Sequence, residues 1–447
     1  MDKTKKNVYK LKNGIKVIII PLNTSLTHIS ISLLLGENHE TKTTIGITHF
    51  MEHLISMMTS EKYPDYNYIK TELAKRSANS NAYVSNYETK IYITGFYKDF
   101  EFFIDLLSNT IKDFKLDEKI AVTEKNAVIQ EIRNIIADNQ YIFDYQINKY
   151  LFPKYAYQYD YIEHIKFIKK YDISKIIDFI NNHVIIQNMV ISVSCPNNSL
   201  IKTQKIINKY FDNIKNKSHK RAKIIYPIYH HKNKQLHIVA VKNSQHNANS
   251  FIRLYVCKKI EYLSNEYLCL ILLKEILFNF DTGVFYNTLR KEYGLIYNID
   301  LNFNFDRHNP KSSHYYIHTS TEYNNIPNVI YLILEIIKNY SITDDDIQNA
   351  RNSILFKYEK MKFHNLTSYN KHYEQLLLHN KPIIELSSIC KKYQNMKNSL
   401  VRRFFQKMKD DILNHGILFY YSNKIMNKAI RLKLSNNYKY KLHKIEK

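Results

Sequence analysis

The chain has 447 residues, of which 45% are hydrophobic and 13% aromatic, which excludes a disordered chain and favours roughly two to four domains. Its formal net charge is +24 at pH 7, from 65 Lys and Arg against 41 Asp and Glu. Because this excess is spread along the chain and accompanies abundant Asn, Ile and Tyr with scarce Gly and Pro, we attribute it to AT-rich codon usage, as in an intracellular parasite or a large virus. We therefore do not expect a nucleic acid partner.

Apolar runs and cysteines indicate the compartment. The longest apolar candidate, Leu268–Phe280, is interrupted by Lys274 and Glu275, so we expect no membrane-spanning helix. The N-terminal residues lead into a strand pattern without a signal core or an amphipathic presequence, which predicts residence in the cytoplasm, that of the host if the protein comes from a virus or a parasite. The four cysteines are scattered and form no C-x-x-C pair, so we expect reduced thiols.

The first half of the chain mixes strand and helix patterns. Two strand-like segments around Asn13-Gly14 predict a hairpin, and His28–Leu35 alternates like a half-buried strand. Further patterns predict, in chain order, the helix Tyr66–Arg76, a hairpin of Ser80–Ser85 and Lys90–Gly95, the helices Phe100–Phe114 and Glu118–Asp138, the strand Asn188–Ser194 and the helix Ser199–Phe211. This mixture predicts an α+β domain over residues 1–215.

A predicted helix around Ile45–Met58 carries the most informative motif. His49-Phe50-Met51-Glu52-His53 has the order H-x-x-E-H, in which two imidazoles hold a metal and the carboxylate between them serves the attacking water. On a helix, His49 and His53 lie about 40° apart around the axis, and Glu52 falls on the same side. The motif alone leaves two interpretations open, a metal site or two histidines in an apolar core.

A third metal ligand could come from the predicted helix Glu118–Asp138. Glu124 and Glu131 are seven residues apart on it, which is two helical turns, so they share a face within about 20°. One of these carboxylates is a plausible third ligand.

The second half repeats the architecture without repeating the sequence. Residues 216–234, basic and polar with His230-His231, are the best linker candidate, and we expect these histidines to be solvated loop residues. From residue 235 to 447 the patterns predict the strands Leu236–Val241 and Phe251–Val256, the helices Asn265–Phe280 and Phe285–Glu292, the strands Tyr297–Asn304 and His314–Thr319, the helices Asn328–Tyr340 and Asp344–His364, and the strand Ile417–Tyr421. Only the first half carries H-x-x-E-H.

Several motifs in the same order resemble the insulinase/pitrilysin superfamily of zinc metallopeptidases, most closely its members of about 50 kDa such as the mitochondrial processing peptidases. The motifs that carry the resemblance are the Leu11-x-Asn13-Gly14 hairpin, Gly46-x-x-His49-Phe50-Met51-Glu52-His53, Asn81-Ala82-Tyr83-Val84-Ser85, Glu124-x6-Glu131, Asn188-Met189, Tyr210-Phe211 and Leu289-Arg290-x3-Gly294-Leu295-x-Tyr297.

The resemblance implies a catalytic site. It implies one zinc ion per chain held by His49, His53 and Glu131, with Glu52 as the general base and Glu124 as the carboxylate that orients a ligand histidine. It also implies that Arg290 and Tyr297 grip the substrate backbone and the oxyanion. Peptide substrates would add as a strand at Asn81, Ala82, Tyr83, Val84 and Ser85.

The resemblance also implies an architecture and partners. We expect two homologous α/β-roll domains, each a mixed or antiparallel sheet with helices on one face, that form half of a clamshell, with the second domain over residues 235–447. The expected partners are peptide substrates and a second copy of the chain, or a related subunit in a heterodimer. The expected function is a zinc-dependent metalloendopeptidase; the alternative is a catalytically silent scaffold or peptide-binding subunit.

Overall fold

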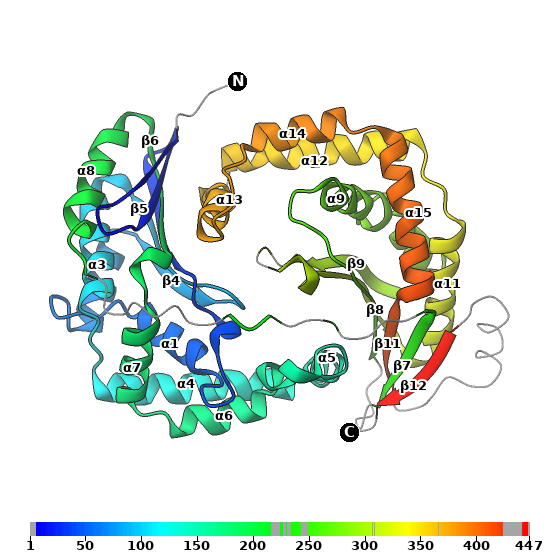
Figure 1. Cartoon of the computed structure of the whole chain (residues 1–447), viewed down its shortest axis with the longest axis horizontal. Helices are drawn as coiled ribbons and strands as arrows, with labels where there is room; N and C mark the ends of the chain where they lie inside the picture. The colour runs from blue at the N-terminus through cyan, green and yellow to red at the C-terminus, as the bar shows by residue number, and fades with distance from the viewer. Residues whose placement is uncertain are drawn as a thin grey trace. The chain divides into compact units, whose positions relative to one another are not determined.

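The computed structural model contains two six-stranded sheets, each in its own compact unit (Figure 1). The structure describes residues 6–215, 224–226, 229, 234–242, 249–305, 307, 309–364, 366–422 and 440–445. Unit 1 comprises residues 1–137, 157–225 and 360–384, and unit 2 comprises residues 138–156, 226–359 and 385–447. Most of the predicted linker, including His230 and His231, lies outside the described residues.

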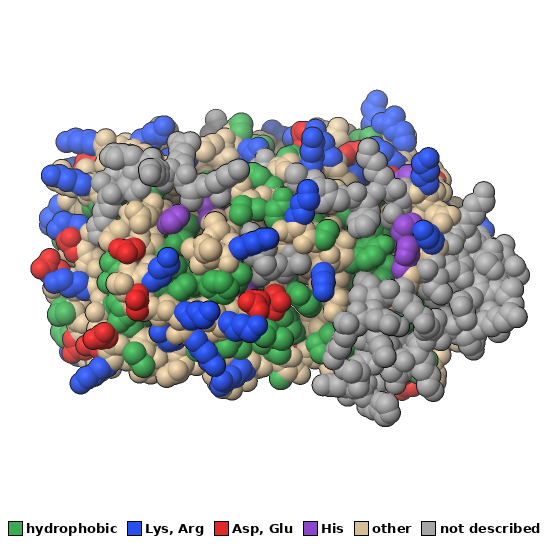
Figure 2. Space-filling model, turned by 60° about the horizontal axis from the view of Figure 1, so that its bottom comes forward, with side chains coloured by type: hydrophobic (Ala, Val, Ile, Leu, Met, Phe, Trp, Pro, Cys, Tyr) green, Lys and Arg blue, Asp and Glu red, His purple; other side chains and the backbone are tan. Residues whose placement is uncertain are grey.

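Charged side chains of both signs lie on the face of the molecule that Figure 2 displays. On this face, Lys and Arg side chains are interspersed with acidic and apolar ones.

In the part of the chain that the structure describes, no helix combines the length and the apolar character needed to cross a membrane. All four cysteines are free thiols, as the sequence predicts, and Cys195 and Cys269 are buried.

Unit 1 is built on a mixed sheet. Its strand order is β1 (Asn7–Lys10), β2 (Lys16–Leu22), β6 (Met189–Pro196), β3 (Leu26–Leu33), β5 (Thr89–Phe96) and β4 (Asn79–Val84). The β2–β6 pair is parallel and the other pairs are antiparallel. The helices of this unit are α1 (Ile47–Ser56), α2 (Tyr66–Lys75), α3 (Phe100–Lys112), α4 (Glu118–Ala137), α6 (Tyr161–Lys170), α7 (Ile173–His183), α8 (Leu200–Phe211) and α13 (Leu366–Leu378).

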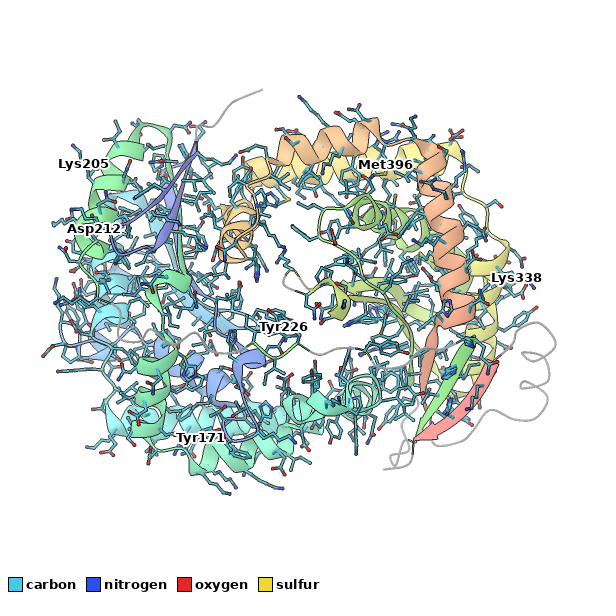
Figure 3. All side chains as sticks on the ribbon, in the orientation of Figure 1. Tyr171, Lys205, Asp212, Tyr226, Lys338 and Met396 are labelled. Carbon is cyan, nitrogen blue, oxygen red and sulfur yellow. The ribbon has the colours of Figure 1, made fainter. Side chains whose placement is uncertain are left out.

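Unit 2 repeats the order of five of these strands, whereas its outer edge strand, β12 (Tyr440–Ile445), comes last in the chain and pairs in parallel with its neighbour. Its sheet runs β12, β7 (Leu236–Lys242), β11 (Ile417–Ser422), β8 (Asn249–Cys257), β10 (His314–Glu322) and β9 (Ile296–Asn304). Its helices are α5 (Asn139–Leu151), α9 (Asn265–Phe278), α10 (Val284–Tyr286), α11 (Ile326–Asn339), α12 (Asp344–His364, whose last residues belong to unit 1), α14 (Leu386–Asn395) and α15 (Asn398–His415). Met396, labelled in Figure 3, lies where α14 ends and α15 begins. The predicted pair of α+β domains with mixed sheets is confirmed.

The compact units differ from the contiguous domains that we expect from the sequence, because each contains one helical segment from the other half. In unit 2, α5 packs its apolar residues Phe143, Ile147 and Leu151 against strands β7 and β11. In unit 1, α13 lies on β2, β3 and β6. The serine hydroxyls of Ser30 and Ser32 both donate to the Glu374 carboxylate of α13.

The prediction of a half-buried strand at His28–Leu35 is therefore wrong. The odd-numbered residues of β3 face the apolar core and the even-numbered ones face α13, so the strand is buried on both sides. Glu374 also forms an ion pair with Lys90 at 2.6 Å, and the two side chains are 0% and 5% exposed. A buried charge is tolerated when an opposite charge and hydrogen bonds satisfy it, as they do here.

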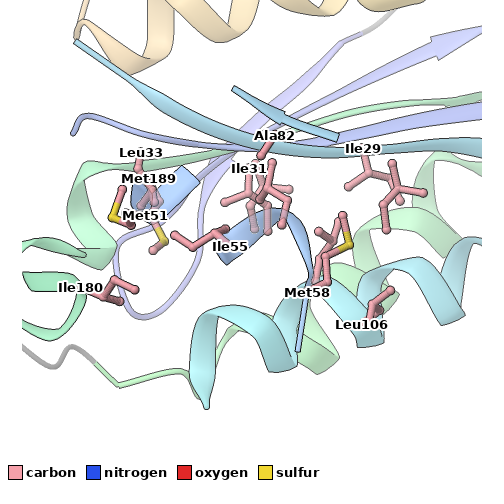
Figure 4. Close-up of a cluster of buried hydrophobic side chains, with 14 of the residues drawn as sticks. Ile29, Ile31, Leu33, Met51, Ile55, Met58, Ala82, Leu106, Ile180 and Met189 are labelled. Atoms are coloured by element: carbon pink, nitrogen blue, oxygen red, sulfur yellow. The ribbon is translucent and has the colours of Figure 1, made fainter. Parts of the chain in front are cut away.

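The core of unit 1 lies between the sheet and α1. Figure 4 shows Met51, Ile55 and Met58 beneath Ile31 and Leu33 of the sheet. The apolar residues of α1 are buried on several sides, as the sequence predicts for a helix enclosed in a domain. Because the apolar side chains of α1 are packed in this way, the orientation of the helix is fixed, and with it the direction in which His49, Glu52 and His53 project.

Candidate metal centre

The start of α1 is fixed by groups outside the motif. Gly46, the N-cap, has φ +75°, a left-handed conformation that favours glycine, and a Cβ there would lie 3.2 Å from Nδ1 of His164. The buried Glu40 carboxylate accepts hydrogen bonds from the backbone N–H of Gly46 at 2.8 Å and of Thr48 at 2.9 Å. These bonds satisfy amides at the helix N-terminus and anchor the turn that precedes His49.

The capping role of Glu40 is not apparent from the sequence. Glu40 lies in the loop before α1, and its carboxylate reaches across eight residues to cap the helix. The available signal was an acidic residue shortly before the start of a helix. The sequence does not show whether such a carboxylate is buried against the helix or exposed to solvent, because it does not show that this loop is buried.

Three predicted ligands meet at one place. His49 and His53 of α1 and Glu131 of α4 each offer a ligand atom, and these atoms all lie within 4.8 Å of one another. Nε2 of His49 is 3.7 Å from Oε1 of Glu131, and Nε2 of His53 is 3.3 Å from Oε2 of Glu131. These distances place the predicted ligands of α1 and α4 next to one another.

The Glu124 carboxylate lies within hydrogen-bond distance of one of the two imidazoles. Its Oε2 lies 3.2 Å from Nδ1 of His53, so that His53 donates a proton there and keeps the lone pair on Nε2. Nε2 is the atom that faces Glu131. This pairing of a histidine with a carboxylate is the arrangement that sets the tautomer of metal-binding histidines.

Glu52 lies beside the ligand atoms. Its Oε2 is 3.9 Å from Nε2 of His53, and its side chain is 13% exposed. Burial raises the pKa of the Glu52 carboxyl, against the effect of His53, and the nearby Glu131 and Glu124 raise it further. Burial also lowers the pKa of His49, which favours the neutral imidazole that a metal requires.

The donor set fits a zinc ion. Two imidazole nitrogens and one carboxylate oxygen are the three protein ligands typical of catalytic zinc, and ligands of a tetrahedral zinc ion lie about 3.3 Å apart at ordinary bond lengths. The measured separations of 3.3 and 3.7 Å are close to this value. His49, His53 and Glu131 could therefore hold zinc with little rearrangement.

The strand predicted to bind substrate lies at an edge. β4, which contains Asn81, Ala82, Tyr83 and Val84, is the last strand of the sheet that the described residues form, and Ser85 follows it. Ala82 points into the core, whereas the Tyr83 hydroxyl donates to Glu88. Among the strands, β4 makes the most extensive contact with α1. An edge strand beside the candidate metal centre is suited to adding a peptide strand.

Arg290 and Tyr297 belong to unit 2 and lie next to each other. The Arg290 guanidinium donates to the backbone oxygens of Ile296 at 3.2 Å and Tyr297 at 2.9 Å, and it lies 4.5 Å from the centre of the Tyr297 ring. The Tyr297 side chain is 73% exposed. The structure thus brings this predicted pair together and leaves the phenol open to solvent.

Two family descriptions match the chain. Residues 17–159 match "Insulinase (Peptidase family M16)", and residues 170–354 match "Peptidase M16 inactive domain". Together the two matches cover more than half of the chain. The protein belongs to the M16 insulinase family of peptidases, within the superfamily that its motifs resemble.

Curated relatives match in part. The chain is 25% identical over 219 residues to the mitochondrial-processing peptidase subunit beta of Dictyostelium discoideum, a match covering 48% of this chain and 46% of the relative. It is 26% identical over 132 residues to Protease 3 of Escherichia coli, covering 29% of this chain and 14% of the relative. The chain thus spans less than half the length of these curated relatives.

Solved structures share the fold over nearly the whole chain. A protease from Helicobacter pylori superposes with a TM-score of 0.76 at 17% identity, covering 94% of this chain and 99% of the other. The first half of the periplasmic protease PqqL from Escherichia coli gives a TM-score of 0.73 at 14% identity, covering 98% and 97%. At these identities the likeness shows the fold alone.

Proposed function

We propose that the protein is a zinc-dependent metalloendopeptidase that hydrolyses extended peptides. The observation that carries this proposal is the convergence of His49, His53 and Glu131 within 4.8 Å, with Glu52 beside them. Three ligands and an adjacent carboxylate base are the set that metal-assisted peptide hydrolysis requires. Membership of a peptidase family supports the same conclusion.

In this proposal His49, His53 and Glu131 hold one zinc ion per chain. When bound, zinc supplies a Lewis acid for the scissile carbonyl and lowers the pKa of an attacking water. Glu124 keeps the proton of His53 on Nδ1, so that Nε2 stays available as a ligand.

Glu52 moves the proton in the proposed reaction. Its carboxylate takes a proton from the attacking water and passes it to the nitrogen of the leaving amine. The largely buried position of Glu52 supports this role, because a carboxylate with a raised pKa accepts a proton more readily.

Two further parts of the chain would bind the substrate. The free edge of β4 would pair with the peptide backbone and hold it extended, which gives affinity without strict sequence preference. Arg290 and Tyr297 would grip the backbone and donate to the oxyanion. We propose that the working form is a homodimer, or a heterodimer with a related subunit, and that it acts in the cytoplasm.

A zinc assay combined with one substitution tests the proposal. Purified wild-type protein should contain close to one zinc ion per chain by elemental analysis and should cleave an unstructured peptide library. Glu52→Gln should keep its zinc and lose hydrolysis by roughly 10²-fold or more. Glu118→Gln, on the exposed start of α4, is the matched control and should retain activity. Wild-type protein that folds but binds no zinc would overturn the proposal.

The second candidate is a catalytically silent scaffold or peptide-binding subunit. The description of the second matched domain as inactive, and the partial coverage of the curated peptidases, favour it. A zinc-free protein that binds peptides without cleaving them, and that copurifies with a related subunit, would support this candidate instead.

A further inference from the structure

Unit 2 contains a pocket that plays no part in the proposed peptidase chemistry. It has a volume of about 750 Å³ and lies where the end of α14 and the starts of α15 and α9 meet. It is lined by Asn265, Ser388, Lys391, Lys392, Asn395, Met396, Lys397, Ser399, Leu400 and Arg403. This volume is in the range of small-molecule sites, which is roughly 300–1,000 Å³.

The lining of the pocket is strongly basic. Lys391, Lys392, Lys397 and Arg403 all contribute to it, and none of its ten residues is acidic. Within the described part of the chain none of these four side chains forms an ion pair, whereas Arg402, which directly precedes Arg403, is paired with Asp344. Four unpaired cations around one hollow create a local positive potential that attracts an anion.

The helix that begins at the pocket adds to this potential. The N-cap of α15 is Lys397, which makes no capping hydrogen bond through its side chain, and the first turn contains no acidic residue. Helix N-termini carry a partial positive charge and are stabilised by anions, so a lysine cap followed by Arg403 in the second turn is electrostatically unfavourable. A bound anion would offset both the partial positive charge of the helix N-terminus and the charges of Lys397 and Arg403.

Hydrogen bonds from α12 fix the turn between α14 and α15. Nη2 of Arg351, on α12, donates to the backbone oxygen of Met396 at 2.9 Å and to Oδ1 of Asn398 at 3.0 Å. Asn398 in turn donates to Asp344, and Met396 is buried. The wall of the pocket is therefore preorganised, which lowers the entropic cost of binding a ligand there.

We propose that this pocket binds a small anion with several adjacent phosphate groups, either an inorganic oligophosphate or the phosphate chain of a nucleotide. Lysine ammonium groups, an arginine guanidinium and serine hydroxyls are the groups that bind phosphate oxygens. The volume admits a ligand of nucleotide size but not a long polymer. The site uses no residue of the candidate metal centre, so it stands independently of the peptidase proposal.

Calorimetric titration of the full chain with sodium tripolyphosphate, in magnesium-free buffer at 150 mM salt, tests this site. Wild-type protein should bind one tripolyphosphate per chain, and the triple variant Lys391→Gln/Lys392→Gln/Arg403→Gln should bind at least about tenfold more weakly. The matched control is Lys169→Gln/Lys202→Gln/Lys205→Gln, which removes the same charge from exposed, unpaired lysines of α6 and α8 (Lys205 is labelled in Figure 3). The control should bind as tightly as the wild type.

A second titration, with ATP, distinguishes the two sources of phosphate. If ATP binds no more tightly than tripolyphosphate, the pocket recognises the phosphates alone. If ATP binds more tightly, the nucleoside also contributes. Both results support the site. Absence of binding, equal weakening in the control variant, or unchanged binding in the pocket variant would overturn the proposal. Tighter binding of a glutamate-rich peptide at the same residues would also overturn it, in favour of an acidic protein partner.

Discussion

Oε2 of Glu124 lies 3.2 Å from Nδ1 of His53, while Nε2 of the same ring faces Glu131 at 3.3 Å. Glu124→Ala should therefore weaken zinc binding by about 10- to 100-fold, because the ring loses the partner that fixes its tautomer and orientation. Competition with a zinc-chelating dye measures this affinity directly. Glu118→Ala, on the same helix, is the control. Equal zinc affinity in the wild type and in Glu124→Ala would show that Glu124 plays no part in the site.

Tyr297→Phe should lower kcat by roughly 10²-fold with little change in unfolding temperature, because in the proposed reaction its phenol donates to the oxyanion, while the exposed side chain is not part of the core. Steady-state kinetics on a fluorogenic peptide separates the effect on kcat from that on KM. Tyr293, which is 53% exposed and four residues earlier, provides the control variant Tyr293→Phe. A similar loss in both variants would point to a general disturbance of this segment.

Glu374→Leu should destabilise the protein by about 3–5 kcal/mol, because it leaves the buried ammonium group of Lys90 without its partner. The double variant Lys90→Met/Glu374→Leu should recover part of this loss, since it removes both charges. Urea unfolding followed by circular dichroism gives the midpoints. The exposed pair Lys166–Glu163 is the comparison, and Glu163→Gln should shift the midpoint far less than Glu374→Leu does. A double variant no more stable than Glu374→Leu would contradict this account.

Acid should destabilise the protein through His28. Burial, with the charge of Lys90, lowers the pKa of His28 to about 3, whereas an unfolded histidine titrates near 6.5. The contribution of a neutral His28 is complete above pH 6.5 and is lost as the pH falls toward 3, by up to about 1.4 kcal/mol per pH unit. The urea midpoint of wild type should thus fall between pH 7 and pH 5 more steeply than that of His28→Gln. Parallel pH dependences of the two proteins would exclude His28 as a cause.

Local spacing accounts for only part of the candidate metal centre. His49, Glu52 and His53 share one helix, and Glu124 and Glu131 share another, so helical spacing places the residues of each helix on one face. It does not show that the two helices meet, and the set of His49, His53 and Glu131 came from the resemblance to the family. The hairpin at Asn13-Gly14 was predictable because its signal is local, and Gly14 adopts the positive φ that such a turn requires.

The contacts of α13 could not be predicted in this way. Ser30 and Glu374 are 344 residues apart, and alternating serines in a strand have the pattern of a solvent-exposed face. Only the fold shows that a helix covers them. The loop carboxylate Glu40 was missed for a related reason, because its capping role depends on burial that no local pattern reveals.

The place of α13 in unit 1 also has a consequence for synthesis on the ribosome. The strands and the core helices of unit 1 are complete by residue 211, yet one face of their sheet carries Lys90 and a row of serines whose cover is made more than 150 residues later. Domains usually fold as they emerge, in order from the N-terminus. In this chain the sheet of unit 1 keeps a polar face exposed until α13 has been synthesised. A fragment that ends before α13 would therefore lack the helix that covers this face.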